Sequence, residues 1–471
     1  MRAVQCLLAS VFLAAWFVAA NAQTAPPAGS AAPSARAPAA RAVAPAHDSG
    51  FRIPGSFEPV AAIWLGFDRG HAAWTAAMVA ALAPHVPLRL LVRDEAAARE
   101  ARDTLHDFGV DVQGLRFHVD AHAAFFLQDA AVFALDGRGR IGVVDLKWSG
   151  HGLAAWCERR HADDAEHASA CANSLDRERD VLSRTIAAFA GARVIDTELR
   201  LEGGGVEVNG RGTMIANEAL LRSRNPGWSR ADLQRALLQL PGVRKVLWLP
   251  EGPAEDPHLR STITGSYVGW GTGGHTDQFV RFADPQTVLL AWVPEAQAAA
   301  HPVARLTRER MKRNLEILSR ATDADGRPLR VVKVPMPRVL ERPLILSAQA
   351  DTAYSEQWSP HDFPLHEGRQ DGDAVTQVAP ASYLNYVVAN GVVLVPDYAA
   401  HGTPSSTQQK VRQIFERSFP GRRIVFVDSA AANWYAGGPH CATLSQPAGR
   451  EVQRREPLSS APIQVGRTHS R

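Results

Sequence analysis

Two glycine-rich motifs contain the side chains with the clearest chemical use. Cys441 lies in GGPHCATLSQP (residues 437–447), and His275 and Asp277 lie in GTGGHTDQFVRF (residues 271–282). A cysteine attacks as its thiolate, so an ordinary thiol pKa of about 8.5 calls for a nearby positive charge. Histidine is the usual group that moves a proton at neutral pH. The motifs predict a nucleophile with a proton shuttle, although a lone cysteine is more often structural and a His-x-Asp pair is also half a metal site.

Carboxylates occupy two further loops of the same kind. Glu202 leads directly into three glycines in RLEGGGVEV (residues 200–208), and Asp129 follows an apolar aromatic run. Each alone is more often a cap or turn residue. Together with Asp277 they supply three negative charges beside a thiol and an imidazole. A guanidinium group carries five N–H donors in a plane that carboxylates match in pairs, so this set predicts attack on a guanidinium carbon.

A repeated unit is expected to position these loops. Each unit has an amphipathic helix, a β-branched strand, a polar loop and a returning strand. The helical patterns cover residues 72–86, 95–108, 176–190, 229–240, 303–321 and 405–419. Strands are expected at 115–119, 192–197, 243–249, 329–334 and 422–427, and returning strands at 141–146, 212–217, 287–292 and 391–396. The chain is therefore expected to be an α/β protein.

The polar residues recur at a fixed interval along these units. Asp129, Glu202 and His275 are 73 positions apart (202 − 129 and 275 − 202), and Asn385 and Cys441 occupy comparable places in the last two units. The stretch 336–378 is expected to be an inserted loop. A fixed period with one polar residue per unit is typical of a radial repeat whose loops face a common axis. A plain α/β sheet with chance spacing is the alternative.

The ends of the chain do not resemble a core. Residues 1–22 contain an apolar run ending in Ala-Asn-Ala, which predicts a secretory signal peptide with cleavage after Ala22. An Ala/Pro-rich linker over 23–50, a catalytic domain over 51–447 and a disordered tail over 448–471 are expected to follow. The predicted location is periplasmic or secreted, with no stable membrane association after cleavage. The net charge of +3 and the lack of a basic stripe exclude nucleic acid as a partner.

Three cysteines remain after removal of the signal peptide. Cys157 and Cys171 lie 14 positions apart in one polar, His-rich loop and are close enough for a local disulfide. That pairing leaves Cys441 alone, and an odd cysteine in an exported protein indicates either an intermolecular bond or a free reactive thiol. All three being reduced is the alternative. His161 and His167 with the two cysteines imitate a zinc site, but the absence of a C-x-x-C pair favours the disulfide.

Five separated segments resemble the agmatine deiminase family, which includes the peptidylarginine deiminase of the Porphyromonas type. They are FEPVAAIWLGF (57–67), LEGGGVEVNGRGTMIANEALL (201–221), GHTDQFVRF (274–282), ASYLNYVVANGVVLVP (381–396) and HCATLSQP (440–447). Their order along the chain strengthens the resemblance. It implies a five-bladed, pseudo-symmetric α/β propeller in a single catalytic domain, which agrees with the radial repeat.

The resemblance also implies roles for the repeated polar residues. It makes Cys441 the nucleophile and His275 the general acid and base. Glu202 corresponds to the carboxylate that orients the histidine. Asp129 and Asp277 correspond to the pair that binds the guanidinium nitrogens, and Asn385 lines the site. The implied reaction passes through a covalent amidino-thioether on the cysteine, releases ammonia and a ureido product, and needs no metal or organic cofactor.

The substrate is less defined than the chemistry. Residues 126–132 keep Asp129 but lose the arginine, glycine and proline usual in the family, and residues 271–273 are Gly-Thr-Gly where acidic residues are usual. Residues 147–151 replace an Arg-rich patch. The expected partner is therefore a small guanidino compound or an arginyl peptide: agmatine, or a peptidyl or free arginine derivative. A non-catalytic guanidinium- or polyamine-binding protein and an amidinotransferase are the alternatives, and release of ammonia separates them from a deiminase.

Overall fold

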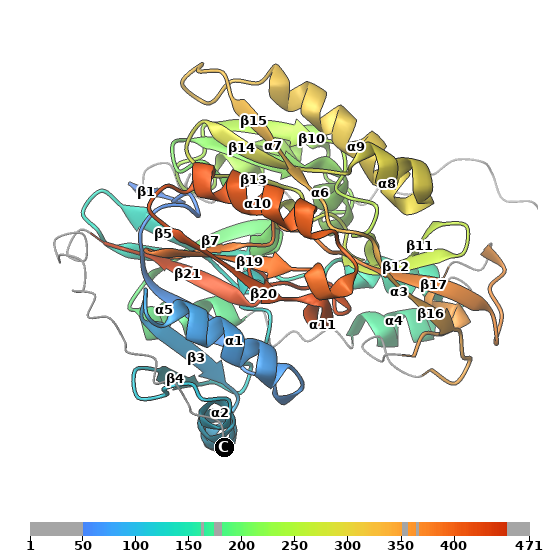
Figure 1. Cartoon of the computed structure of the whole chain (residues 1–471), viewed down its shortest axis with the longest axis horizontal. Helices are drawn as coiled ribbons and strands as arrows, with labels where there is room; N and C mark the ends of the chain where they lie inside the picture. The colour runs from blue at the N-terminus through green and yellow to red at the C-terminus, as the bar shows by residue number, and fades with distance from the viewer. Residues whose placement is uncertain (1–49, 162–163, 174–180, 351–356, 364–366, 450–471) are drawn as a thin grey trace, which may run out of the picture. The chain divides into compact units, whose positions relative to one another are not determined.

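Helices alternate with short strands along the described part of the chain, which makes the protein a mixed α/β structure (Figure 1). The computed structural model describes residues 50–161, 164–173, 181–350, 357–363 and 367–449. These residues belong to one compact unit that begins at Pro45. The predicted signal peptide, all but the last residue of the linker, and the predicted tail beyond Gly449 lie outside the described residues.

Five of the sheets in the described part of the chain share one pairing pattern. In each, a short strand pairs antiparallel with the next strand of the sheet, which then pairs parallel with a third. The sheets are β21 (Thr443–Pro447), β2 (Val60–Gly66), β3 (Leu88–Val92) and β4 (Arg116–Val119); β1 (Phe51–Arg52), β5 (Val132–Asp136), β6 (Ile141–Lys147) and β7 (Arg193–Arg200); β8 (Glu207–Val208), β9 (Thr213–Asn217) and β10 (Lys245–Leu249); β13 (Val280–Phe282), β14 (Thr287–Trp292) and β15 (Arg330–Pro335); and β18 (Val387–Val388), β19 (Val392–Asp397) and β20 (Arg423–Asp428). A repeat is therefore present, but its unit differs from the predicted one: the strand before each polar loop and the returning strand after it lie in different sheets, as β7 and β9 do.

Most of the helices pack apolar residues against these sheets. The helices are α1 (Ala72–Leu82), α2 (Glu95–Asp107), α3 (Leu153–Arg160), α4 (Ala165–Asn173), α5 (Leu182–Ala190), α6 (Glu218–Arg224), α7 (Arg230–Leu238), α8 (Glu295–Ala300), α9 (Pro302–Ser319), α10 (Ser405–Ser418) and α11 (Ala430–Asn433). In α1, Met78 and Leu82 are buried against Leu90 of β3 and Val392 of β19. Five of the six predicted helices are confirmed within four residues at each end. The sixth, 176–190, is described only from residue 181, and α5 begins at Leu182.

A sixth sheet corrects the prediction of an inserted loop over 336–378. Within that stretch, β16 (Leu340–Ile345) pairs antiparallel with β17 (Ala374–Ala379), and β17 pairs parallel with β12 (Tyr267–Thr272). The sheet is completed by β11 (His258–Thr264), which pairs with β12. The sequence of β16 includes charged residues and a proline, a combination that weakens a strand signal. The sheet adds a wall beside the repeated units (Figure 1).

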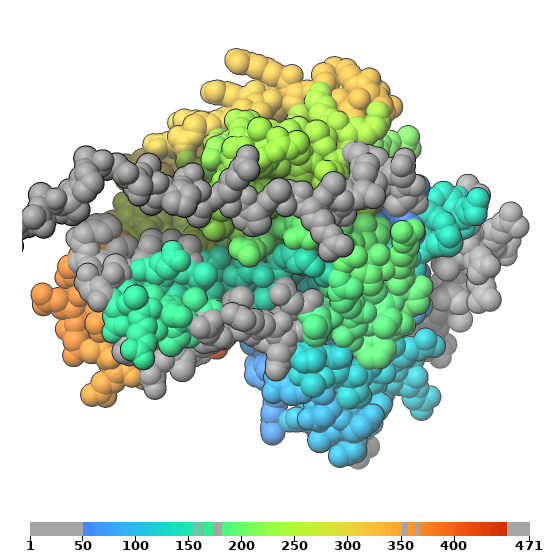
Figure 2. All heavy atoms as spheres, turned by 180° about the vertical axis from the view of Figure 1, so that it is seen from behind, coloured from blue at the N-terminus to red at the C-terminus, as the bar shows by residue number. Residues whose placement is uncertain are grey.

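The segment predicted to be a polar loop around Cys157 and Cys171 forms two helices instead, α3 and α4. Its apolar residues Leu153, Trp156 and Cys157 are buried together, so the helix has a small core of its own. Trp156 Nε1 donates to the carbonyl oxygen of Arg260 in β11 at 3.3 Å. The two helices therefore lie against the sixth sheet, and in Figure 2 their turquoise atoms lie beside the orange atoms of β16 and β17. No helix among the described residues has the length and apolarity needed to cross a membrane.

Candidate active site

All the predicted site residues except Asp277 lie just before the first strand of one of the five similar sheets. Asp129 ends the 3-10 turn Leu127–Asp129 before β5, and Glu202 precedes the turn Gly203–Gly205 before β8. His275 precedes the turn Thr276–Gln278 before β13, and Asp277 lies within that turn. Asn385 lies two residues before β18, and Cys441 lies two residues before β21. The constant spacing in the sequence therefore corresponds to equivalent positions in the fold.

Cys441 is buried and contacts polar groups from two other units. Its Sγ lies 3.1 Å from Asn385 Nδ2, which donates to it, and 3.5 Å from Asp277 Oδ2. Asn385 Oδ1 also accepts from the backbone nitrogens of His440 and Cys441, so the amide fixes the cysteine loop. Burial raises the pKa of the Cys441 thiol well above its ordinary value, and the charges of Asp277 and Asp129 raise it further. The side chains that contact Sγ in the described part of the chain include no cation, so the thiolate form needs a positive charge brought beside the sulfur.

His275 is held by a carboxylate that is itself held by an arginine. Its Nε2 donates to Glu202 Oε2 at 3.1 Å, and Arg224 Nε lies 3.0 Å from both Glu202 oxygens. Burial raises the pKa of Glu202, but the charge of Arg224 and the hydrogen bond from His275 outweigh burial and hold that pKa well below its usual range. Burial lowers the pKa of His275, but Asp129 and Glu202 outweigh it and raise that pKa to about 9. His275 is therefore an imidazolium at neutral pH.

The two aspartates predicted to bind a guanidinium each contact a histidine. Asp277 Oδ2 accepts from His440 Nδ1 at 2.8 Å, and Asp129 Oδ2 accepts from His151 Nε2 at 3.0 Å. Burial raises the pKa of Asp277, but the hydrogen bond and charge of His440 outweigh it and lower that pKa. Within the described part of the chain, Oδ1 of each aspartate is buried and has no hydrogen-bond partner. Two carboxylate oxygens therefore remain available to N–H donors of a ligand.

The glycines of the motifs leave room for these side chains. A Cβ added at Gly204 would lie 2.4 Å from His275 Nδ1, and one at Gly438 would lie 2.5 Å from Asn385 Oδ1. Real Cβ atoms do not approach other heavy atoms so closely. The glycines before the cysteine and after the glutamate are therefore required by side chains from neighbouring units.

A cavity of about 610 Å³ leads to Cys441 and Asp129. Aromatic side chains form much of its wall, and its charged residues are two arginines and two aspartates. The wall includes His71, Phe125, Phe126, Trp156, Trp270, Trp434, Tyr435, Arg260, Arg342, Asp68, Asp129 and His151. Several of these come from β11, β12 and β16, so the sixth sheet contributes to the outer wall of the cavity.

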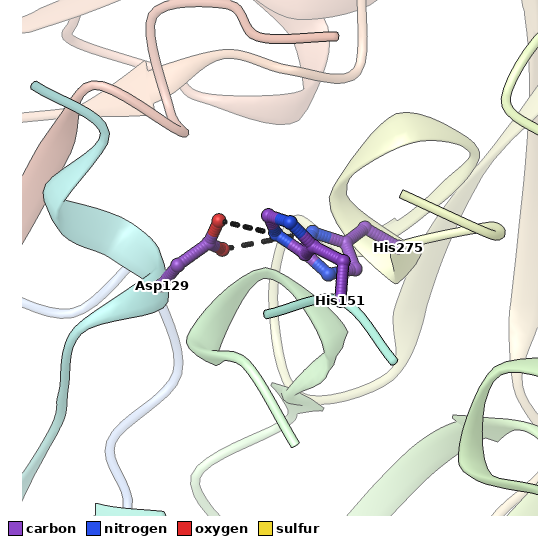
Figure 3. A group of neighbouring side chains, drawn as sticks. All are labelled: Asp129, His151 and His275. Atoms are coloured by element: carbon purple, nitrogen blue, oxygen red, sulfur yellow. Dashed lines mark hydrogen bonds and ion pairs between the residues drawn. The ribbon is translucent and has the colours of Figure 1, made fainter. Parts of the chain in front are cut away.

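One group of side chains in the site has the composition of a metal site. Oxygen and nitrogen atoms of Asp129, His151 and His275 all lie within 4.8 Å of one another. Figure 3 shows both imidazoles facing the Asp129 carboxylate, with His151 nearer to it than His275. The sequence-based prediction that the site holds no metal was made for His275 and Asp277. The combination of Asp129, His151 and His275 was not part of it.

Three residues of the site were not predicted. His440 precedes the cysteine in the HCATLSQP motif, but adjacency alone gave no role. His151 lies in the stretch 147–151, which the sequence analysis considered only as a possible contact for the tail of the substrate. Arg224 is the last residue of α6 and is completely buried against Glu202. A basic residue in the last turn of a short helix is common, so no sequence signal marked it.

The prediction that Cys441 is a free thiol is confirmed. Cys157 is disulfide-bonded, and Cys441 is a free, buried cysteine. The side chain of Cys171 is not among those described, so its pairing with Cys157 stays a prediction.

Comparisons with known proteins agree with the fold and the motifs. The family model of the Porphyromonas-type peptidyl-arginine deiminases matches residues 52–447. An agmatine deiminase of Pseudomonas aeruginosa is 26% identical over 415 residues, 86% of this chain and 97% of that protein. One of Ectopseudomonas mendocina is 27% identical over 417 residues, 85% of this chain and 96% of that protein. The solved agmatine deiminase of Enterococcus faecalis has the same fold with a TM-score of 0.64, at 22% identity over 86% of this chain and 98% of that chain.

The match of the family model covers every predicted site residue, and the five similar sheets carry those residues at equivalent positions. This chain belongs to the Porphyromonas-type peptidyl-arginine deiminase family.

Proposed function

We infer that this protein is a hydrolase that deiminates a guanidino group through a covalent intermediate on Cys441. The observation that carries the inference is a cavity that ends at the free thiol of Cys441 and at Asp129, with Asp277 3.5 Å from Sγ and the His275 imidazolium 3.7 Å from Asp129. Binding of a guanidinium alone would use the carboxylates. It would not need a thiol or a histidine held in one orientation by Glu202 and Arg224.

Substrate binding supplies a positive charge beside the sulfur. We expect Asp129 and Asp277 to accept N–H donors of the guanidinium through their free oxygens. The cation then lies beside Sγ and lowers the pKa of the Cys441 thiol, whose proton is lost to solvent, and the guanidinium carbon lies within reach of the thiolate. Desolvation of the empty site thus keeps the cysteine unreactive until a cationic substrate arrives.

His275 then moves protons in both halves of the reaction. After attack by sulfur, a proton from the His275 imidazolium leaves with ammonia, giving a cationic amidino-thioether and a neutral imidazole. The imidazole next takes a proton from water and the hydroxide attacks the same carbon. The C–S bond then breaks as the proton of the new hydroxyl passes to sulfur, which gives the ureido product and the Cys441 thiol and leaves His275 as an imidazolium. Glu202 and Arg224 orient the ring through these steps and do not touch the substrate.

The cavity wall favours a substrate whose tail carries an acyl or carboxylate group. Arg342 lies at the wall, with its guanidinium 4.5 Å from the centre of the Trp434 ring and Nε donating to Gln377 Oε1 at 2.8 Å. These contacts hold its terminal nitrogens in place for a carboxylate. The acidic residue of the outer wall, Asp68, is 52% exposed and already bonded to His71. The substrate we propose is therefore free or peptidyl arginine in preference to agmatine.

Purified protein assayed with agmatine, arginine and an arginyl peptide tests this function. We expect equal amounts of ammonia and ureido product, with the highest kcat/KM for a substrate that has a carboxylate or acyl tail. Product with no ammonia, formed only when an acceptor amine is added, would make the protein an amidinotransferase. Tight binding with no turnover of any of the three would make it a binding protein.

We also propose that the five similar sheets are the blades of a closed five-bladed α/β propeller. The shared strand pairing supports it, as does the placement of one polar residue from each sheet at one site. The antiparallel pairing of β2 with β21 also supports it, because it joins the first and last parts of the described domain in one sheet. An experimental structure would test the closure.

Export is proposed on the signal peptide pattern and on one structural feature. A disulfide at Cys157 is stable in an oxidising compartment and is rare in the cytosol. Edman sequencing of the protein from the periplasm or medium is expected to begin at Gln23. An intact N-terminal methionine on protein recovered from the cytoplasm would contradict this proposal.

A further inference from the structure

The cluster of Asp129, His151 and His275 has two buried atoms with no hydrogen-bond partner among the described residues. They are Asp129 Oδ1 and His275 Nδ1, which lie 3.7 Å apart. His275 is fully buried, and the Asp129 side chain is 8% exposed. Their separation is that of a long ion pair rather than a hydrogen bond, so both atoms keep the capacity to bind a further group.

His151 adds a third donor to this pair. It holds a left-handed backbone conformation with φ at 57°, which is uncommon for a residue other than glycine. That conformation directs its ring toward Asp129, where Nε2 lies 3.0 Å from Oδ2 (Figure 3). A carboxylate oxygen and two imidazole nitrogens form the three-ligand set that leaves a fourth position open on zinc.

Glu202 supplies the support that a metal-binding histidine usually has. Its carboxylate accepts from His275 Nε2, which fixes the ring so that Nδ1 faces Asp129. In metal sites, the second ring nitrogen of a ligating histidine normally donates to a carboxylate in this way. The three donor atoms lie within 4.8 Å of one another, so small side-chain rotations bring them to bonding distances of about 2.0–2.2 Å.

We propose that Asp129, His151 and His275 bind a divalent transition metal ion of the zinc type, and that this ion excludes the guanidino substrate. The exclusion rests on the proposed function, because the ion occupies the carboxylate that holds the guanidinium and the imidazole that moves protons. The metal ion and the guanidinium group are both cations, and both are attracted to the same carboxylates. The ion is an inhibitor, and the hydrolytic reaction proceeds in its absence.

Equilibrium dialysis of metal-stripped protein against Zn²⁺ measures binding at this site, and the measurement does not depend on enzyme activity. Wild type is expected to bind one ion more than His151→Gln, or to bind it at least about tenfold more tightly. Asp129→Asn, which has the same shape, is expected to lose the same ion. The matched control is His401→Gln, because His401 also bonds a carboxylate, Asp428, at 2.9 Å but lies at an exposed surface. This control is expected to bind Zn²⁺ as wild type does.

Competition is measured in Cys441→Ser protein, which we expect to bind substrate without turning it over. Arginine is expected to raise the apparent Kd of Zn²⁺ in proportion to its concentration. Equal Zn²⁺ binding by wild type, His151→Gln and Asp129→Asn would overturn the metal site and leave the deiminase function standing. Loss of the ion in both variants, in a wild-type protein that releases no ammonia, would keep the metal site and overturn the proposed function. Simultaneous binding of ion and arginine would overturn the exclusion.

Discussion

The reacting centre and the outer wall of the cavity differ in how their side chains are held. Glu202 and His275 have no exposed surface, and each has partners from another part of the chain. On the outer wall, Arg342 is half-buried and Asp68 is exposed. The centre is built on the loops of the five similar sheets, whereas much of the wall comes from the sixth sheet and from α3 and α4.

The difference indicates that reaction and substrate choice are specified by separate parts of the chain. A buried ion pair that loses one partner leaves an uncompensated charge, so a substitution at the centre is strongly destabilising. Arg342 is only half-buried, so its loss leaves no buried charge without a partner, and we expect it to change mainly what the wall binds. Substitutions at the centre should therefore abolish chemistry for all substrates, while substitutions at the wall should change their ranking.

Cys441→Ser is expected to have the largest effect. The hydroxyl keeps the shape of the site but is not activated as a nucleophile, so kcat should fall by roughly 10³-fold or more for every guanidino substrate. Binding of arginine, measured by calorimetry, should remain. The control is Cys157→Ser, which removes a disulfide outside the centre and should retain turnover of small substrates. Wild-type kcat in Cys441→Ser protein would exclude the covalent mechanism.

Asp277→Asn is expected to change two measurements in opposite directions. Loss of a charge-assisted hydrogen bond worth about 1.5–3 kcal/mol should lower kcat/KM by roughly ten- to a hundredfold. The same change removes a negative charge 3.5 Å from Sγ, so the pKa of the thiol should fall. Alkylation of Cys441 by iodoacetamide at pH 7.5 should become faster.

Asp107→Asn is the control for this prediction, since the Asp107 side chain is 84% exposed and is not one of the site residues. Asp107→Asn should change neither kcat/KM nor the rate at which Cys441 is alkylated. If Asp277→Asn slowed alkylation as well as turnover, its carboxylate would be stabilising the thiolate, and the account of a thiol activated by substrate charge would be wrong.

Much of the centre could be predicted because its residues lie in local motifs. The glycines around Cys441, His275 and Glu202 lie within a few positions of those residues, so one short window marks each loop, although the side chains that Gly204 and Gly438 admit come from other units. The repeat could be predicted for the same reason, since each helix and buried strand has its own periodicity. Asn385 and Asp129 were found through their equivalent places in that repeat.

The remaining parts depend on contacts between distant segments. Arg224 reaches Glu202 from the end of a helix, and His151 reaches Asp129 because of a left-handed backbone conformation. Neither has a local signal. The sixth sheet pairs β12 with β17 across more than a hundred residues, and its edge strand β16 alternates exposed and half-buried residues including charges. Sequence periodicity cannot identify such a strand without its partner.

Arg342→Gln is expected to have a smaller, selective effect. The substitution removes a charge from the outer wall, so kcat/KM for arginine and an arginyl peptide should fall about tenfold, near the lower end for a charged hydrogen bond because the site is half-exposed. Agmatine, which lacks the carboxylate, should change by less than about twofold. Asp68→Asn is the matched variant and should not lower the rate with arginine. Equal losses for arginine and agmatine would show that Arg342 supports the wall rather than binding the tail.

The smallest expected effect is on stability and concerns the charge of His275. Its folded pKa of about 9 lies above the ordinary value of 6.5, so the stability it contributes is present below pH 6.5 and is lost as the pH rises through 9. Burial raises the pKa of Glu207 to about 7, which lowers stability over part of the same range, so wild type alone cannot isolate the histidine. The measurement is therefore a difference: the decrease in Tm between pH 6 and pH 9.5 should be larger in wild type than in His275→Gln by about 1–2 °C. Equal decreases would mean that the imidazolium is not stabilised by Asp129 and Glu202, and the proton that leaves with ammonia would have to come from another group.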